Sequence, residues 1–278
     1  MMKKHLIRAA FVLGAAIALS VLLYPVVANL VNSRNQSRAV TGYMAGVALS
    51  DGSGWPAMLE EAGEWNRWLL GKKNKFFFTL EETMRYNRLL DTGRGVIGVL
   101  EIEKIDVKLP IYHGTDEGVL QVGVGHMQGT SLPMGGAGTH AFLTGHRGLP
   151  SSQLLSHLDK MAVGDTFNIY VLSDILTYRV DEIRTVLPEE AGTLPIDPAM
   201  DYCTLVTCTP YGVNTHRLLV RGRRIETAVA TRILAAASEA HRPNKCLVLA
   251  FALAPILPLL LIYTLAQAIK IIKKGKKR

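Results

Sequence analysis

Cys208 and Arg217 are the residues whose types and spacing most clearly suggest chemistry. The segment 210–214 (Pro-Tyr-Gly-Val-Asn) is typical of a turn between two strands, and a hairpin there places Arg217 beside Cys208. A neighbouring arginine favours the nucleophilic thiolate and can hold the oxyanion formed when a thiolate attacks an amide carbonyl. The pair indicates nucleophilic catalysis. Taken alone, however, a cysteine in a strand is more often a small buried apolar residue.

A cysteine nucleophile also needs a proton donor for the leaving amine, and histidine is the usual one. Of eight histidines, His146 is favoured because it follows the apolar run 141–144 and has glycines close on both sides, at 145 and 148. That setting leaves an imidazole accessible at a strand end. His216 is disfavoured because it points to the opposite strand face from Arg217. Spacing alone leaves four others open: His113, His126, His140 and His157.

Two uncharged apolar segments, 9–31 and 246–269, are each long enough to cross a membrane as a helix. Their outer flanks carry nine of the 31 Lys and Arg residues and none of the 23 Asp and Glu residues. The positive-inside tendency places both termini in the cytoplasm and the middle of the chain outside. Because the middle is nearly neutral, the basic net charge of +8 does not indicate nucleic-acid binding. The alternative for the first segment is a cleaved signal peptide, with 26–28 (Val-Val-Ala) as a weak cleavage site.

The spacing of the cysteines argues against a disulfide in the exported domain. Cys203 and Cys208 lie five residues apart in one predicted strand, which puts them roughly 16 Å apart and on opposite faces. A disulfide needs Cα atoms within about 7 Å. Cys246 lies at the membrane boundary. An unpaired Cys208 in an exported domain favours a catalytic role.

Short β-rich runs separated by turn residues dominate the chain after residue 95. They predict a small barrel or sandwich. Before them, helical spacing at 58–70 and 80–90, with Thr79 and Glu82 as a capping box, predicts a helical arm. Only 152–159 interrupts the β-rich part with helix-like spacing. The strand candidates are 96–102, 107–111, 140–144, 166–171, 176–183, 202–208 and 217–224.

Four segments resemble the sortase motifs of Gram-positive bacteria. They are Leu-Pro-Ile-Tyr-His-Gly-Thr at 109–115, Gly-Val-Gly-His-Met-Gln-Gly-Thr-Ser at 123–131, Thr-Gly-His-Arg-Gly at 144–148, and Thr-Leu-Val-Thr-Cys-Thr-Pro-Tyr-Gly at 204–212 with its continuation to 222. The resemblance covers about residues 95–225. The last motif and the C-terminal apolar segment resemble class C sortases, the pilin polymerases. The resemblance implies a mainly β fold, an eight-stranded β-barrel with short helices. In this chain we expect an N-terminal helical arm and two transmembrane helices in addition.

The resemblance also implies a mechanism. Cys208 attacks the Thr–Gly bond of an LPXTG-type sorting signal, His146 protonates the leaving amine, and a pilin lysine then accepts the acyl group. Arg217 stabilises the tetrahedral states or positions the substrate, and Thr207 and Thr144 are candidates for the substrate groove. No metal or organic cofactor is implied. The expected partners are pilin subunits with C-terminal sorting signals and membrane lipid, with no nucleic acid.

One departure from the class C pattern concerns the lid. Class C sortases usually carry Asp-Pro-aromatic in a lid over the cysteine, but residues 32–95 contain no Asp-Pro. An aromatic side chain could fill the same place without the aspartate, and the candidates are Phe76, Phe77, Phe78 and Trp55. The alternative is that these aromatics are packing residues of the helical arm.

We therefore expect six regions along the chain. They are a cytoplasmic tail with a transmembrane helix or signal anchor (1–31), a helical arm with a possible lid (32–94), the sortase barrel (95–228), a juxtamembrane linker (229–245), a second transmembrane helix (246–269) and a basic cytoplasmic tail (270–278). The alternatives to pilus polymerisation are a sortase that anchors proteins to the peptidoglycan cross-bridge, a hydrolytic cysteine protease of the same fold, and a non-catalytic pilus-associated scaffold.

Overall fold

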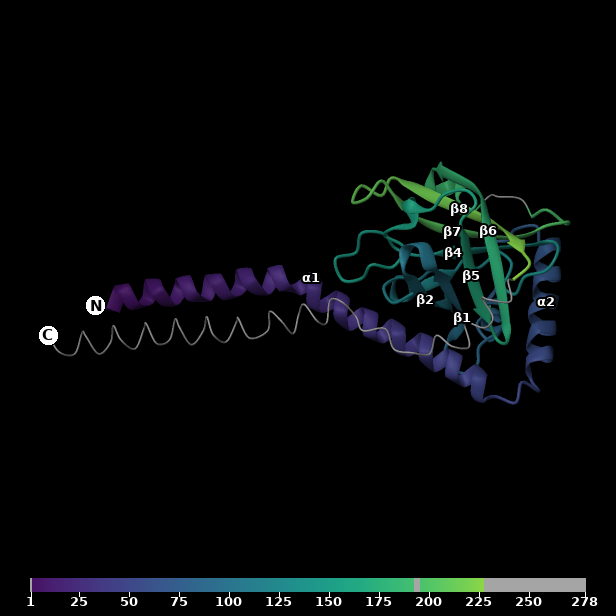
Figure 1. Ribbon diagram of the computed structural model, residues 1–278, viewed down its shortest axis with the longest axis horizontal. Coiled ribbons are helices and arrows are strands. Elements are labelled where there is room, and N and C mark those ends of the chain that lie inside the picture. The colour runs from purple at the N-terminus through teal and green to yellow at the C-terminus, as the bar shows by residue number, and fades with distance from the viewer. Residues whose placement is uncertain (1, 193–195, 228–278) are drawn as a thin grey trace. The chain divides into compact units, whose positions relative to one another are not determined.

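The computed structural model describes residues 2–192 and 196–227, and its centre is a closed eight-stranded β-barrel (Figure 1). Around the barrel the strands follow the order β1-β2-β3-β4-β7-β8-β6-β5, and β5 pairs with β1 to close it. Two neighbouring pairs, β2 with β3 and β4 with β7, are parallel, and the other pairs are antiparallel. The barrel confirms the predicted fold class.

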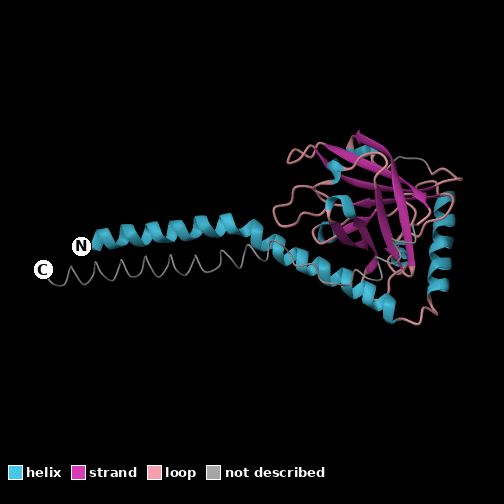
Figure 2. Cartoon of the chain, in the orientation of Figure 1, coloured by secondary structure: helices cyan, strands magenta, loops and turns pink. Residues whose placement is uncertain are grey.

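The strand bounds agree closely with the runs predicted from the sequence. A short strand in a Gly-rich segment, β3, was not predicted because three residues give no readable alternation. Figure 2 shows how strands dominate this part of the chain. The strands are β1 (Val96–Ile102), β2 (Val107–His113), β3 (Val124–His126), β4 (Thr139–Thr144), β5 (Thr166–Val171), β6 (Asp174–Val186), β7 (Asp201–Thr209) and β8 (His216–Ile225).

The helix-like spacing at 152–159 does not correspond to a helix, so that prediction is wrong. The segment forms turns, and only η2 (Leu158–Lys160) is a 3₁₀ turn. Leu154 has a left-handed backbone with φ of 37°, which an α-helix excludes. Other short elements are η1 (Glu103–Ile105), α4 (Glu117–Leu120) and η3 (Pro188–Glu190).

The arm helices α2 (Trp55–Gly71) and α3 (Leu80–Tyr86) pack against the barrel. Trp65 of α2 and Tyr86 of α3 are buried in the same cluster as the barrel interior. The predicted capping box at the start of α3 is confirmed: the Thr79 hydroxyl accepts from the Glu82 amide, and the Glu82 carboxylate accepts from the Thr79 amide. The arm is thus part of the folded domain.

Helix α1 (Met2–Leu49) continues well beyond the apolar segment that ends at residue 31. Its apolar part is long enough to cross a membrane, and no other helix in the described ranges is both long and apolar enough to do so. Further along, Val40 and Tyr43 are buried against β1 and β5, and the Tyr43 hydroxyl donates to Ile97 O and accepts from the Leu172 amide. These contacts explain why the helix does not stop at the polar residues after position 31. The predicted linker, second span and C-terminal tail lie outside the described residues.

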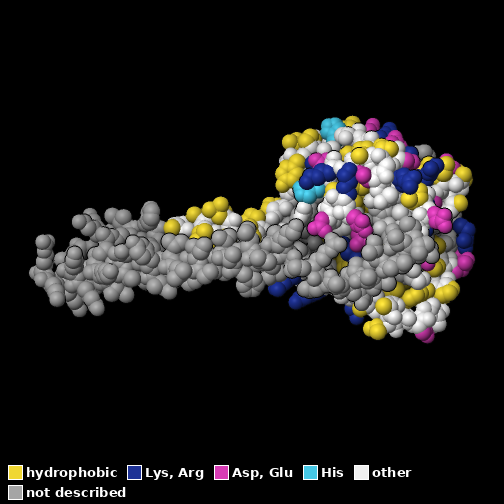
Figure 3. All heavy atoms as spheres, viewed as in Figure 1, with side chains coloured by type: hydrophobic (Ala, Val, Ile, Leu, Met, Phe, Trp, Pro, Cys, Tyr) yellow, Lys and Arg dark blue, Asp and Glu magenta, His cyan; other side chains and the backbone are white. Residues whose placement is uncertain are grey.

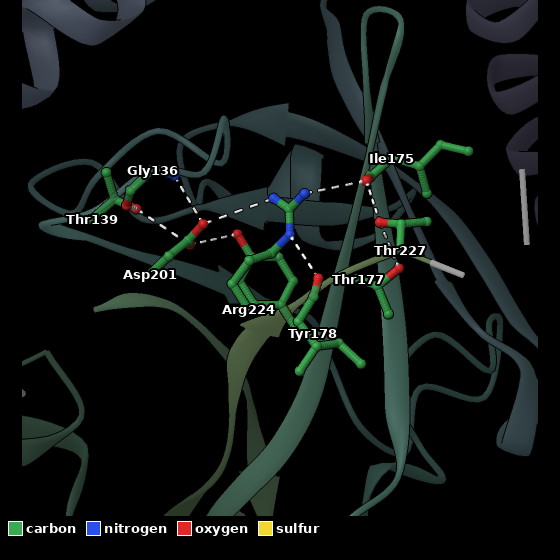
Figure 4. A network of polar contacts seen from close by, with 9 residues as sticks. Gly136, Thr139, Ile175, Thr177, Tyr178, Asp201, Arg224 and Thr227 are labelled. Atoms are coloured by element: carbon green, nitrogen blue, oxygen red, sulfur yellow. Dashed lines mark hydrogen bonds and ion pairs between the residues drawn. The ribbon is translucent and has the colours of Figure 1, made fainter. Parts of the chain in front are cut away.

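A buried polar network holds the beginning of β7. The Asp201 carboxylate accepts from the Tyr178 hydroxyl at 2.9 Å and from the Gly136 amide at 2.8 Å, and the Arg224 guanidinium lies 3.8 Å away (Figure 4). Burial raises the pKa of Asp201 despite these donors. The network joins β6, β7 and β8 at the N-terminal end of β7, whereas Cys208 lies near the C-terminal end.

Charges of both signs are interspersed over the barrel face seen in Figure 3. This mixture fits the nearly neutral middle of the sequence.

Candidate active site

Cys208 and Arg217 are directly opposite each other on β7 and β8. Side chains alternate along a strand, and Cys203 and Leu205 point into the barrel core. Cys208 therefore lies on the outer face of the barrel. Directly opposed residues share a face, so Arg217 is its neighbour there. The structure thus brings together the two residues that the turn at 210–214 predicted to be adjacent.

His146 lies just past the end of β4, level with Cys208 on the neighbouring strand β7. Strand β4 runs parallel to β7, with Thr144 opposite Val206, and the Gly145 amide continues the ladder by donating to Val206 O at 3.0 Å. His146 lies two residues after Thr144, and Cys208 lies two residues after Val206. Neighbouring strands lie about 4.8 Å apart. Cys208 is therefore flanked by His146 on one side and Arg217 on the other.

The Arg217 guanidinium is fixed by the hairpin that carries it. Its Nη1 donates to Asn214 O and to His216 O, both at 3.2 Å. Asn214 adopts a left-handed backbone with φ of 61°, which asparagine tolerates better than most residues. The turn residues thus both reverse the chain and anchor the cation beside the thiol.

A small apolar cluster continues from these residues along the outer face. Val206 and Leu219 are an opposed pair one step from Cys208 and Arg217, and with Phe142 and Ala191 they form a buried cluster. Met127 and Val186 pack against it. A reactive group at the end of an apolar surface suits a peptide substrate with apolar side chains.

The comparisons with known proteins agree with this geometry. The family description "Sortase domain" matches residues 100–225. Sortase C1 from Streptococcus agalactiae is 47% identical in its crystal structure, with a TM-score of 0.66, covering 69% of this chain and 100% of that one. The chain belongs to the sortase family.

Two further relatives refine the assignment. A crystal structure of Streptococcus pneumoniae sortase C, whose description refers to pilin substrate specificity, is 40% identical with a TM-score of 0.61, covering 68% of this chain and 96% of that one. Sortase A of S. agalactiae serotype III is 32% identical over 48% of this chain, a match that spans only 54% of that relative's length. The structural matches confirm a class C sortase, a class within a family of cysteine transpeptidases.

The loop that carries His146 in this sortase is held mainly by side chains. Arg147 donates to Thr209 Oγ1 at 3.2 Å and to Asp159 Oδ2 at 2.7 Å, and its guanidinium lies over the Tyr211 ring. The Thr207 hydroxyl donates to Gly145 O at 2.8 Å. Arg147 therefore ties the end of the histidine strand to the end of the cysteine strand. No local pattern in the sequence predicts this role, because an arginine beside a histidine gives no signal of where its guanidinium will bind.

The two groove candidates occupy different environments. Thr207 is 1% exposed and faces the barrel interior, so its hydroxyl holds the histidine loop. Thr144 is half-buried on the outer face, and its hydroxyl oxygen is a buried polar atom with no hydrogen-bond partner. Of the two, Thr144 is the one on the same outer face as Cys208.

The four lid candidates also separate into two pairs. Phe78 stacks on Trp65 with ring centroids 6.0 Å apart, and Trp55 packs against the main core. Phe76 and Phe77 are 55% and 68% exposed. Both Gly129 and Gly192 lie close enough to the Phe76 ring that an added Cβ would come within 3.0 Å of it. Phe76 therefore covers the loops next to Met127 and Ala191, at the apolar cluster.

Three other histidines of the barrel, at positions 113, 126 and 140, lie in buried or mostly buried environments. His126 is fully buried: Nε2 lies 2.8 Å from Ser131 O and Nδ1 lies 2.7 Å from the Tyr86 hydroxyl, so the neutral ring carries its proton on Nε2. Burial lowers the pKa of His126 to about 3 and that of His113 to about 4. His140 is buried against Thr204. None of these three is free to serve Cys208, whereas the pairing of β4 with β7 places His146 beside it.

Proposed function

We propose that this protein is a membrane-anchored class C sortase that cleaves an LPXTG-type sorting signal between Thr and Gly and joins the threonine to a lysine amine of a pilin. The observation that carries the proposal is the flanking of Cys208 by His146 and Arg217 on one outer face of the barrel. That arrangement supplies a nucleophile, a proton carrier and an oxyanion partner at one point.

The chemistry follows from these positions. The Cys208 thiolate attacks the threonine carbonyl, and the developing oxyanion is stabilised by the Arg217 guanidinium. His146 gives its proton to the departing glycine amine as the C–N bond breaks, which leaves a thioacyl enzyme. The lysine amine then attacks the thioester and loses a proton to His146. The products are an isopeptide bond and the regenerated thiol.

The proposed location is the membrane, with the barrel outside. The apolar part of α1 supplies one anchor, and the contacts of Tyr43 with Ile97 and Leu172 connect that helix to the barrel. Both termini lie in the cytoplasm in this proposal, with residues 246–269 as the second span.

The test is a transfer assay with the full chain in detergent. The chain is incubated with a sorting-signal peptide and one of three acceptors: a lysine-bearing pilin, a peptidoglycan cross-bridge peptide, or water alone. Mass spectrometry of the products then identifies the acceptor. We expect an isopeptide bond to the pilin lysine. Transfer only to the cross-bridge would assign wall anchoring, hydrolysis only would assign a protease, and pilin polymerisation by Cys208→Ala would assign a scaffold.

We also propose that Phe76 and Phe77 form the lid without the usual aspartate. Support comes from their exposure and from the position of the Phe76 ring over Gly129 and Gly192, next to the apolar cluster. Phe78 is instead a packing residue, because it stacks on Trp65.

Thiol labelling tests the lid. A Phe76→Ala/Phe77→Ala variant should react faster than wild type with a thiol reagent at Cys208, and unfold at nearly the same temperature. Phe78→Ala is the matched control, which should lose stability because it removes a stacked ring. Equal labelling rates in the double variant and wild type would rule out the lid.

A further inference from the structure

Glu117 contacts the ring of His146 from an element that the mechanism above does not use. Its Oε2 lies 3.3 Å from His146 Nε2, and its other oxygen, Oε1, accepts from Gln121 Nε2 at 3.1 Å. Glu117 opens α4, and Gln121 caps the end of the same turn. One carboxylate oxygen is therefore held by its own helix while the other meets the imidazole.

The fold places this helix with little freedom. The Gly114 amide donates to the buried Tyr86 hydroxyl at 3.1 Å, which fixes the chain just before α4. A Cβ on Gly125 would come within 2.2 Å of Gly114 O and 3.2 Å of the Leu120 side chain, so only glycine lets this turn approach β3 so closely. Glu117 is thus presented to His146 by a turn seated on the barrel.

We propose that Glu117 is the positioning residue of His146. By accepting a hydrogen bond from Nε2–H, the carboxylate fixes the rotation and tautomer of the neutral ring, which leaves Nδ1 as the nitrogen that exchanges a proton with the substrate amines. When the Cys208 thiol ionises, its proton moves to Nδ1, and in the first half-reaction that proton passes to the departing amine. In the second half-reaction, Nδ1 takes a proton from the attacking lysine. Nε2–H stays bonded to Glu117 throughout, so proton balance is kept.

The surroundings of His146 favour this assignment. Among the described residues, Glu117 of α4 forms an ion pair with the His146 ring, and two cations belong to the same site: Arg217, opposite Cys208 on β8, and Arg147, the next residue in the chain. The Arg147 guanidinium is committed to Asp159 and Thr209, and that of Arg217 is held by the hairpin carbonyls. Glu117 is therefore the carboxylate that meets the ring. Its bonds to Gln121 and to His146 lower the pKa of Glu117, so it stays ionised at neutral pH.

The experiment compares Glu117→Ala and Glu117→Gln in the full chain in detergent, with a sorting-signal peptide as substrate. Glu61→Gln, an exposed carboxylate of α2, is the control for loss of one negative charge. Because the Glu117 side chain is 67% exposed, we expect kcat of Glu117→Ala to fall by about fivefold with KM nearly unchanged. Glu117→Gln should lose less, since its amide oxygen can still accept from Nε2–H.

A second readout separates positioning from folding. Ring ¹⁵N chemical shifts of His146 should report the Nε2–H tautomer in wild type and a mixture of tautomers in Glu117→Ala. An unchanged kcat, or a lower kcat with unchanged ring shifts, would overturn the proposal. This inference rests on the proposed role of His146, which His146→Ala tests separately. Full turnover in His146→Ala would remove both roles, whereas its loss together with full turnover in Glu117→Ala would remove only that of Glu117.

Discussion

The cysteine side and the histidine side of the site are built in different ways. Cys208 and Arg217 lie on adjacent antiparallel strands that a short turn connects, and the backbone ladder between β7 and β8 fixes their register. His146 lies in a loop just past β4. Two backbone bonds, Gly145 N to Val206 O and Leu155 N to His146 O, hold this loop together with the side chains of Arg147, Thr207 and Glu117. One half of the site depends on the pairing of two adjacent strands, and the other half depends on a few backbone bonds supplemented by long-range side-chain contacts.

This difference indicates where the site can vary. A change in a side chain that holds the histidine loop moves one partner of the reaction, and the strand pair stays in place because its hydrogen bonds do not involve side chains. We therefore expect substitutions beside His146 to give graded losses of activity. Substitutions in the cysteine pair should remove chemistry outright.

The largest effect is expected at the nucleophile. Cys208→Ala should lower turnover of a sorting-signal peptide at least about 10³-fold, because no other group can form the thioacyl bond. Its unfolding temperature should stay close to that of wild type, since the side chain is only half-buried. Turnover and thermal unfolding are measured on the same preparation.

Cys203→Ala is the matched control on the same strand. Cys203 is fully buried in the main core, so its loss should cost about 1 kcal/mol of unfolding free energy while leaving turnover unchanged. Equal losses of turnover in the two variants would contradict the assignment of Cys208 as the nucleophile.

The next largest effect is expected at the other member of the pair. Arg217→Ala should lower kcat about 10²- to 10³-fold, the size seen when one oxyanion donor is removed. Arg217→Lys should recover only part of this loss: Nη1 of the guanidinium now donates to Asn214 O and His216 O and leaves its other donors for the oxyanion, whereas an ammonium has no such fixed set of donors. Steady-state kinetics with a peptide substrate measure both. Full activity in the lysine variant would show that charge alone is sufficient.

The same contrast explains what the sequence could predict. The strand pair was predictable because alternation, a turn cluster and the nine-residue spacing of Cys208 and Arg217 are all local signals. The capping box of Thr79 and Glu82 was predictable for the same reason. The supports of His146 were not, because Arg147 and Thr209 lie 62 residues apart and no local pattern joins them. Strand β3 and the turns at 152–159 were missed because three-residue strands and left-handed residues give no periodic signal.

A moderate effect is expected at the side chain that ties the two halves together. Arg147→Ala removes bonds to Thr209 and Asp159, and the Arg147 side chain is only 8% exposed. Asp159 is 47% exposed and can be solvated once it is alone, so we expect a loss of about 1–2 kcal/mol in unfolding free energy. Because the His146 loop loosens, kcat should fall about tenfold.

Arg67→Ala is the control for removing an arginine that pairs with an acid on the surface. The Arg67 side chain is 64% exposed and pairs with Glu60, so its loss should change the unfolding free energy by less than about 1 kcal/mol and leave kcat unchanged. If Arg147→Ala behaved like Arg67→Ala, the histidine loop would not depend on the Arg147 bridge.

The smallest effect is expected where α1 reaches the same loop. Gln36 Nε2 donates to Ser152 Oγ at 2.9 Å across 116 residues, and both side chains are buried. Ser152 lies in the segment whose Leu155 amide donates to His146 O. Gln36→Leu keeps most of the side-chain volume but removes the donor, so we expect a loss of about 1 kcal/mol in unfolding free energy. The change in kcat should be about twofold, because Arg147 and Thr207 still hold the loop.

Ser37→Ala, on the exposed side of the same helix turn, is the control and should change neither the unfolding free energy nor kcat. A tenfold loss of kcat in Gln36→Leu would mean that helix α1, rather than the Arg147 bridge between the strand ends, sets the position of His146.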